Sequence, residues 1–149
     1  MDFLKQHFYR EGRLTEEQAL LIIREGTRIL QQVPNLLETE APITVCGDTH
    51  GQYFDLMELF RLNGTPSDKH WYLFNGDFVD RGSWSTEIAL LLYANKWLRP
   101  KGFFLNRGNH ETDDMNRVYG FEGECRHKYN ERYVPMMGRT ARALETILT

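Results

Sequence analysis

The first third of the chain carries apolar residues at helical spacing. Thr15 and Gln18 stand where a capping box would start a helix, with each side chain bonding the other residue's backbone. The pattern predicts a helix that begins after Thr15 and ends before Pro34, and residues 1–14 predict a short helix or arm. We expect this segment to be a scaffold without chemistry of its own. Its apolar stripe consists of Ala19, Ile22, Ile23, Leu30 and Val33, with Gly26 on the same side.

Three short apolar runs, 43–46, 71–74 and 103–105, predict buried strands. Between these runs, apolar residues recur at helical spacing. Tyr53, Leu56, Met57 and Phe60 indicate one helix, which ends at 64–66, and Ile88, Leu91, Leu92 and Trp97 indicate another, which Ser83 or Ser85 would cap. This order predicts an α/β fold, N-terminal helices followed by β-α-β-α-β, with right-handed crossovers. Beyond Met115 the pattern weakens, with helices expected within 121–133 and 138–149.

A polar stretch follows each predicted strand directly. The stretches are 47–51 (GDTHG), 76–82 (GDFVDRG) and 107–111 (RGNHE). In parallel sheets the carboxyl ends of the strands face a common crevice, where ligands bind. We therefore expect the three stretches to form one site, with glycines that let the backbone turn and pass close to a bound group.

The residue types in these stretches favour metal and phosphate chemistry. Asp48 and His50 alternate across one residue, so they point the same way in an extended segment. Asp77 and Asn109 add oxygen ligands from the next two strand ends. Oxygen and imidazole ligands without thiolate suit Mn, Fe or Zn, and two such ions would clamp both oxygens of a phosphate ester during hydrolysis.

The remaining polar residues suit proton transfer and oxyanion binding. His110 follows Asn109 directly, so the two side chains should diverge and serve different purposes. We expect His110 to act as a general acid, with Asp80 holding its imidazole. The guanidinium of Arg81 is suited to grip phosphoryl oxygens.

Composition excludes some classes of partner. The 149 residues carry a net charge of −3, so no basic field invites nucleic acid. The apolar run 88–94 is too short to span a membrane. Cys46 and Cys125 do not suggest a disulfide framework, and we expect a soluble protein in a reducing compartment, cytoplasmic or nuclear.

The three polar stretches, in this order and at this separation, resemble the signature motifs of the phosphoprotein phosphatases, a family of metal-dependent serine/threonine protein phosphatases. Residues 2–60 look most like the calcineurin branch, as in 7–14 (HFYREGRL). Residues 74–82 and 109–124 look more like the branch that carries tetratricopeptide repeats, although no such repeats are present here.

The resemblance implies a metallophosphoesterase-like fold and specific roles. Asp48, His50 and Asp77 would hold a first metal, with Asp77 bridging to a second that Asn109 binds. A metal-bound hydroxide would attack phosphoserine or phosphothreonine while Arg81 binds the phosphate. His110, backed by Asp80, would protonate the leaving oxygen. A phosphoprotein substrate and a regulatory subunit are the partners that the resemblance implies.

The resemblance also implies a division of the chain. Residues 1–41 would be a helical segment packing on the domain, 42–134 the first half of a catalytic domain, and 135–149 a divergent tail. The family's second half normally supplies two more histidine ligands and another arginine, so we expect a truncated chain whose second metal site is incomplete. Asn106, where the family usually has leucine, should change local packing alone.

Two alternatives stay open. The chain could be a non-catalytic fragment that binds metal or partners without turnover. A weaker alternative is a metallophosphoesterase that acts on small phosphate esters, against which the family pattern of residues 83–134 counts.

Overall fold

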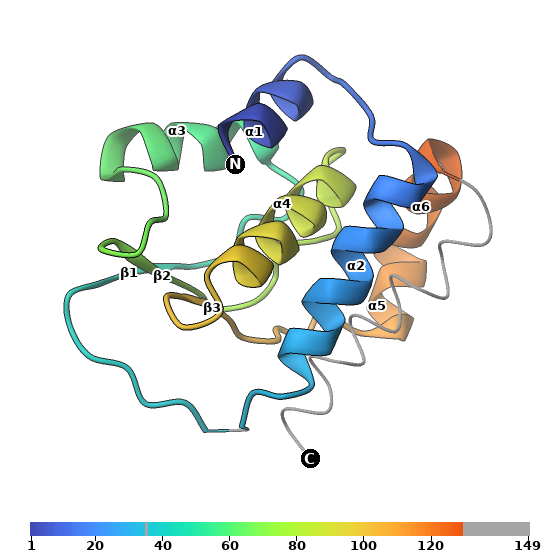
Figure 1. The fold of residues 1–149 in the computed structure, drawn as a ribbon. Coiled ribbons are helices and arrows are strands. Elements are labelled where there is room, and N and C mark those ends of the chain that lie inside the picture. Colours follow the sequence, from blue (N-terminus) through green and yellow to red (C-terminus); the bar gives the residue numbers. More distant parts are fainter. Residues whose placement is uncertain (35, 130–149) are drawn as a thin grey trace.

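The computed structural model describes residues 1–34 and 36–129. It confirms the predicted order of helices, then alternating strands and helices (Figure 1). The predicted helix at 138–149 and the tail at 135–149 lie outside the described residues. The elements are α1 (Asp2–Tyr9), α2 (Glu16–Leu30), β1 (Ile43–Cys46), α3 (Tyr53–Asn63), β2 (Trp71–Phe74), α4 (Ser85–Leu98), β3 (Phe103–Leu105), α5 (Asp113–Tyr119) and α6 (Phe121–Lys128).

The three strands form a parallel sheet in the order β1-β2-β3. Ile43 pairs with Trp71, and Phe74 pairs with Leu105. All three strands have the predicted bounds. Because the strands run in the same direction, the loops that follow them leave from the same edge of the sheet.

One face of the sheet packs on helices. Phe60 of α3 lies edge-on to Tyr72 of β2, with ring centroids 5.4 Å apart, and Phe103 of β3 is fully buried beside Phe74. Side chains alternate between faces along a strand, so Val45 of β1 points the other way and is 64% exposed. The site-bearing loops are therefore anchored to a core that lies on the helix side.

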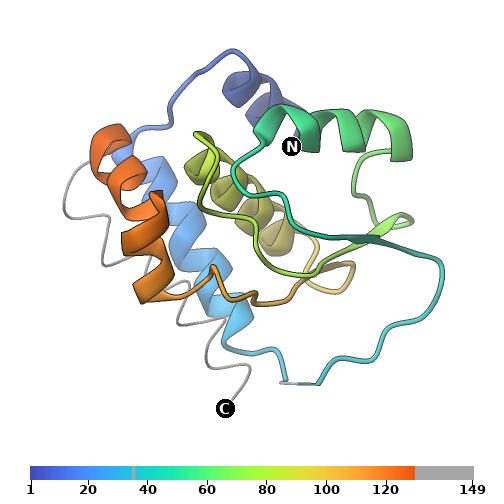
Figure 2. The same cartoon turned by 180° about the vertical axis from the view of Figure 1, so that it is seen from behind.

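Helix α4 is the centre of that core. Its residues from Ser85 to Lys96 are all buried, which is wider than the stripe predicted from its apolar spacing. Helix α2 lies along α4, as Figure 1 and the reverse view in Figure 2 show. Gly26 allows this approach, since a Cβ there would lie only 3.0 Å from Cβ of Tyr93. The N-terminal helix α2 thus packs on the strand-bearing part of the chain.

The two predicted helix caps have different outcomes. The capping box of α2 is confirmed, because Gln18 N–H donates to Thr15 Oγ1 and Thr15 N–H donates to Gln18 Oε1. The prediction of a serine cap for α4 is wrong. The residue that precedes α4 is Trp84, and its side chain makes no capping hydrogen bond. Neither Ser83 nor Ser85 caps the helix.

A carboxylate from α6 takes the place of the serine cap. Glu124 accepts hydrogen bonds from the N–H groups of Ser85, at 3.1 Å, and Thr86, at 2.7 Å. Lys128, one turn further along α6, pairs with Glu124 at 3.0 Å and with Glu87 at 2.6 Å. A negative group at a helix N-terminus is stabilising. The contact therefore stabilises α4 and joins α6 to it.

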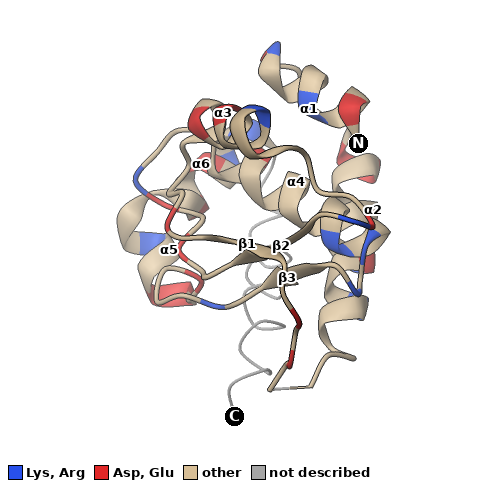
Figure 3. Cartoon of the chain, turned by 90° about the vertical axis from the view of Figure 1, so that its left-hand side faces the viewer, with Lys and Arg blue, Asp and Glu red and all other residues tan. Residues whose placement is uncertain are grey.

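Helix α5 was not predicted, since its sequence DDMNRVY shows little apolar periodicity. The α6 region was predicted, and its described part runs from Phe121 to Lys128. Along the ribbons, acidic and basic residues are interspersed rather than gathered by sign (Figure 3). In the described residues, no helix has the length and apolar content that a membrane crossing needs.

Replacement of Glu124 by alanine should lower the free energy of unfolding by about 1–3 kcal/mol, because two N–H groups of α4 lose their acceptor. Urea denaturation followed by circular dichroism measures this. Glu122→Ala on the same helix is the matched control: it removes ion pairs with Arg126 and Arg117, and should cost under about 1 kcal/mol. Equal losses in the two variants would contradict the capping role.

Lys96 provides a pH-dependent contribution to stability. Its ammonium is buried at the end of α4, donates to the carbonyls of Pro100 and Phe103 at 2.9 Å each, and lies 5.3 Å from the ring centroid of Phe104. Burial lowers the pKa of Lys96 to about 8, from an ordinary value of 10.5. Between these two values the unfolded chain holds the proton and the folded chain releases it.

The contribution of Lys96 to stability should therefore rise as pH increases from about 8 to 10.5 and be lost as pH falls through about 8. We expect the difference in unfolding free energy between the wild type and Lys96→Met to change in this direction across the window. Taking the difference cancels the alkaline titration of other buried groups. A difference that is constant from pH 7 to pH 10 would contradict the lowered pKa.

Candidate functional site

The three polar loops join one another through their backbones. The N–H groups of Thr49 and His50 in the first loop donate to the carbonyl of Asp77 in the second, both at 3.1 Å. Gly82 N–H donates back to the carbonyl of His50 at 2.9 Å. The loops that follow β1 and β2 therefore form one continuous structure, and the polar side chains on them are held together.

Two pairs of glycines bring the loops into direct contact. A Cβ on Gly51 would lie 2.7 Å from the carbonyl carbon of Gly82, and a Cβ on Gly82 would collide with the carbonyl oxygen of His50. A Cβ on Gly76 would likewise collide with the backbone nitrogen of Gly108. These glycines thus allow loop to pass against loop, whereas the sequence had suggested close approach to a bound group.

Backbone strain is concentrated in the same place. His50, Asp77, Asp80 and Arg81 have φ values of 36°, 53°, 68° and 67°. Non-glycine residues rarely adopt this region, and such strain persists only where surrounding contacts hold it. Four of the predicted site residues therefore have their directions set by the fold.

Glu111 is the buried acceptor that holds the second and third loops together. Its carboxylate accepts from the N–H groups of Asp77 at 2.7 Å, Phe78 at 2.9 Å and Gly108 at 2.8 Å. Burial raises the pKa of Glu111, and the three N–H donors oppose that rise. The sequence placed Glu111 in a motif but gave it no role.

Asp48, His50 and Asp77 form a candidate metal-binding group, with one ligand atom of each lying within 4.8 Å of the others. His50 Nδ1 donates to the carbonyl of Val79 at 2.8 Å, which leaves Nε2 as a free acceptor 3.8 Å from Asp48 Oδ2. This arrangement is typical of metal-ligating histidines, whose other nitrogen is fixed by a carbonyl or carboxylate. Two carboxylates and one imidazole fit a divalent cation.

Asn109 belongs to the third loop, which reaches this group through the residue that follows it. The next residue, His110, donates its N–H to Asp77 Oδ1 at 2.8 Å, which brings the loop against the metal-binding group. The carbonyl of Asn109 accepts from the Thr112 hydroxyl at 3.0 Å. Its role as a ligand of a second metal stays a prediction.

His110, Asp80 and Arg81 form a second group that adjoins the first. His110 Nδ1 lies 3.0 Å from Asp80 Oδ2, with both side chains almost fully buried. Arg81 Nη2 lies 3.3 Å from His110 Nε2. Since the carboxylate only accepts and the guanidinium only donates, the contacts assign the proton of a neutral imidazole to Nδ1. The rings of His50 and His110 pack edge to face at 4.7 Å, so the two groups are contiguous.

Sequence reasoning missed two contacts on Asp80 that come from the region after Met115. Phe121 N–H donates to Asp80 Oδ1 at 2.9 Å, and Asn116 Nδ2 donates to Asp80 Oδ2 at 3.2 Å. The weak apolar pattern of that region gave no signal of either contact.

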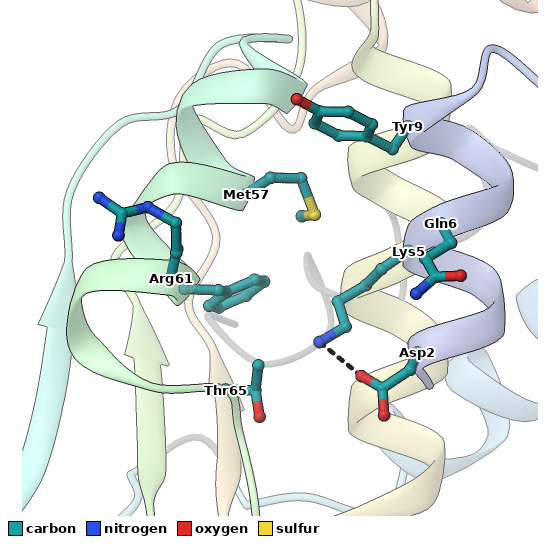
Figure 4. A pocket seen from close by; sticks show the side chains of 8 residues that line it. Asp2, Lys5, Gln6, Tyr9, Met57, Arg61 and Thr65 are labelled. Carbon is teal, nitrogen blue, oxygen red and sulfur yellow. Dashed lines mark ion pairs between the residues drawn. The ribbon is translucent and has the colours of Figure 1, made fainter.

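Two of the cavities among the described residues differ in their relation to the site. One, of about 500 Å³, adjoins the site and is lined in part by Arg81, Tyr119 and Lys128. The other, of about 300 Å³, lies between α1 and α3, where Tyr9, Met57 and Phe60 give it an apolar lining (Figure 4). The cavity in Figure 4 holds none of the predicted site residues, and its Lys5 is paired with Asp2 at 2.8 Å.

The fold and the site define a class of protein that comparison with known families establishes. The family of calcineurin-like phosphoesterases matches residues 41–146, and the chain belongs to that family.

The relatives are serine/threonine-protein phosphatases. The chain is 58% identical over 148 residues to serine/threonine-protein phosphatase T of Aspergillus oryzae, covering 97% of this chain and 31% of the relative. It is 49% identical over 133 residues to human serine/threonine-protein phosphatase 5, covering 87% of this chain and 27% of the relative.

A solved structure that resembles this chain is also a serine/threonine phosphatase. It is a protein serine/threonine phosphatase from Saccharomyces cerevisiae with similarity to human phosphatase PP5, and it superposes with a TM-score of 0.90 at 45% identity, covering 96% of this chain and 49% of that one. The chain spans between about a quarter and a third of the length of the curated relatives it matches.

Metal affinity should depend more on Asp77 than on Asn109, because Asp77 is a member of the three-residue group. We expect Asp77→Asn to raise the dissociation constant for Mn²⁺ by about 10-fold or more, and Asn109→Ala to raise it less. Isothermal titration calorimetry measures both. Asp68→Asn, in a loop at the other end of β2, is the control. Equal Mn²⁺ affinities in Asp77→Asn and Asn109→Ala would contradict the prediction.

Proposed function

We propose that this chain carries part of the active site of a protein serine/threonine phosphatase, which hydrolyses phosphoserine and phosphothreonine esters. The observation that carries the proposal is the line of contacts from Arg81 Nη2 to His110 Nε2, at 3.3 Å, and from His110 Nδ1 to Asp80 Oδ2, at 3.0 Å. This line lies against the candidate metal-binding group. It combines an oxyanion-binding cation with a proton donor held by a buried carboxylate.

Each residue of this line has a distinct task. Arg81 is exposed and binds two phosphoryl oxygens through its planar fork. A phosphate bound there lies beside Nε2 of His110. In its imidazolium form His110 gives the Nε2 proton to the serine or threonine oxygen as that oxygen's bond to phosphorus breaks, returns to the neutral Nδ1–H form, and regains the proton from the attacking water. Asp80 stabilises the imidazolium and keeps Nδ1 protonated. Water supplies the oxygen that the phosphate gains, and the products are the free hydroxyl and inorganic phosphate.

The metal site completes the chemistry. Asp48, His50 and Asp77 would hold one divalent or trivalent ion, and Asp77 with Asn109 would contribute to a second. Mn, Fe and Zn all suit these oxygen and imidazole ligands. When bound, such ions supply Lewis acidity and lower the pKa of a coordinated water. Arg81, Asp80 and His110 act on the phosphate and the leaving oxygen.

The names of the relatives support the choice of substrate. Phosphatase T and phosphatase 5 are serine/threonine-protein phosphatases, and the likeness to them covers nearly the whole of this chain. A phosphorylated protein is therefore the partner that we propose, and a regulatory subunit stays a prediction. A cytoplasmic or nuclear location is part of the proposal, supported by the free, buried thiols of Cys46 and Cys125.

Hydrolysis of a phosphoserine peptide tests the proposal, with Mn²⁺ present and in a version of the protein in which both metal sites are complete. His110→Asn should slow the reaction by about 10²–10⁴-fold, the usual contribution of a positioned general acid. An aryl phosphate should lose less, because its leaving group departs without a proton. His70→Asn is the matched control, since His70 lies before β2 and bonds Thr44.

Two outcomes would contradict parts of this proposal. Equal losses on the peptide and the aryl phosphate would show that His110 is not the acid. Absence of turnover in a version with both metal sites complete, and with Mn²⁺ shown to bind, would favour the alternative of a metal-binding chain without activity.

A further inference from the structure

Asn116 of α5 contacts both members of the His110–Asp80 pair. Its side-chain nitrogen lies 3.2 Å from Asp80 Oδ2 and 2.5 Å from the backbone carbonyl oxygen of His110. Asn116 is only 6% exposed. A primary amide has two N–H donors, and here each has one acceptor. Turning the amide over would place its oxygen against two other oxygens, so the contacts fix its orientation.

The carboxylate of Asp80 is held at both oxygens. Phe121 N–H binds Oδ1, while Asn116 and His110 both bind Oδ2. The last torsion of an aspartate side chain is broad, so a carboxylate with a single partner turns readily. Asp80 is fully buried, and a buried charge requires such donors. The amide of Asn116 therefore restrains the plane of the carboxylate that His110 Nδ1 contacts.

The same amide restrains the histidine. Its bond to the His110 carbonyl ties α5 to the backbone that carries the imidazole, so one side chain fixes both partners. The proton of a neutral imidazole lies on the nitrogen that has an acceptor. With Asp80 oriented, Nδ1 carries the proton and Nε2 is left facing Arg81 and the phosphate site. If the carboxylate turned away, Nδ1 would lose its acceptor and the other tautomer would gain population.

We propose that Asn116 is a positioning residue that fixes the tautomer and direction of His110 through Asp80. The inference rests on the proposed function for its catalytic meaning, since it keeps Nε2 directed at the leaving oxygen. Among the side-chain hydrogen bonds of the described residues, those of the Asn116 amide go to Asp80 and His110, and none goes to the candidate metal-binding group or to the Arg81 guanidinium. Its effect should reach the reaction only through the histidine.

Side-chain nitrogen NMR of the metal-free 149-residue chain, at one pH where the imidazole is neutral, tests this directly. We expect the wild type to hold His110 mainly as the Nδ1–H tautomer. In Asn116→Leu, which keeps similar volume without the donors, the Nε2–H fraction should rise by about two-fold or more. Asn116→Ser keeps one hydrogen-bond donor, so its Nε2–H fraction should lie between those of the wild type and Asn116→Leu. If the leucine variant does not fold, the serine variant is measured in its place.

Asn95→Leu is the matched control. Asn95 is also a buried helical asparagine, whose amide donates to the Leu91 carbonyl, but it lies away from His110. Its replacement should lower stability and leave the His110 tautomer unchanged. An unchanged tautomer in folded Asn116→Ser and Asn116→Leu would overturn the proposal, as would an equal change in Asn95→Leu.

A kinetic arm separates this inference from the proposed function. If phosphopeptide hydrolysis is measurable, Asn116→Leu should lower kcat while KM stays close to the wild-type value, because Arg81 still binds the phosphate. A change confined to KM would count against positioning. The nitrogen signals require neither metal nor turnover, so a tautomer change in an inactive chain would support the role of Asn116 while the proposed function fails.

Discussion

The buried carboxylate of Glu111 is the interaction on which the site depends. It accepts three backbone N–H groups, from Asp77, Phe78 and Gly108, and so holds the loop after β2 against the loop after β3. The N–H groups of Asp77, Phe78 and Gly108 lie beyond the strand ends, and N–H groups left unpaired in a buried loop would each cost about 1–3 kcal/mol. The carboxylate supplies the missing acceptors, and the directions of Asp77 and His110 follow from that.

Contact between the loops imposes a second constraint. Because Gly51 meets Gly82 and Gly76 meets Gly108, the backbones approach more closely than any side chain allows. The residues between these contacts have to turn within a few positions, and His50, Asp77, Asp80 and Arg81 do so at positive φ. The glycines and the strained residues are two consequences of one geometry: three loops that occupy a single edge of a small sheet.

The sequence was sufficient to predict the strands to the residue, the capping box of α2 and the meeting of the three polar loops, because each follows from local periodicity or from the rule that parallel strands share an edge. It did not predict the Glu124 cap or the contact of Asn116 with Asp80. Both join residues more than 30 positions apart in the chain, and neither leaves a local pattern, since a polar residue on a short helix reads as exposed. The tautomer of His110 could not be predicted from the sequence either.

These missed contacts share an origin. Helices α5 and α6 hold Asp80 through Asn116 and the Phe121 N–H, receive the Arg81 N–H at the Tyr119 carbonyl, and cap α4 through Glu124. The motifs supply the atoms that would bind metal and phosphate, whereas this pair of helices sets the direction of His110 and of the Arg81 guanidinium. A chain could therefore keep all three motifs and still lose the geometry, so evidence for the function has to come from the support of Asp80 as well as from the motifs themselves.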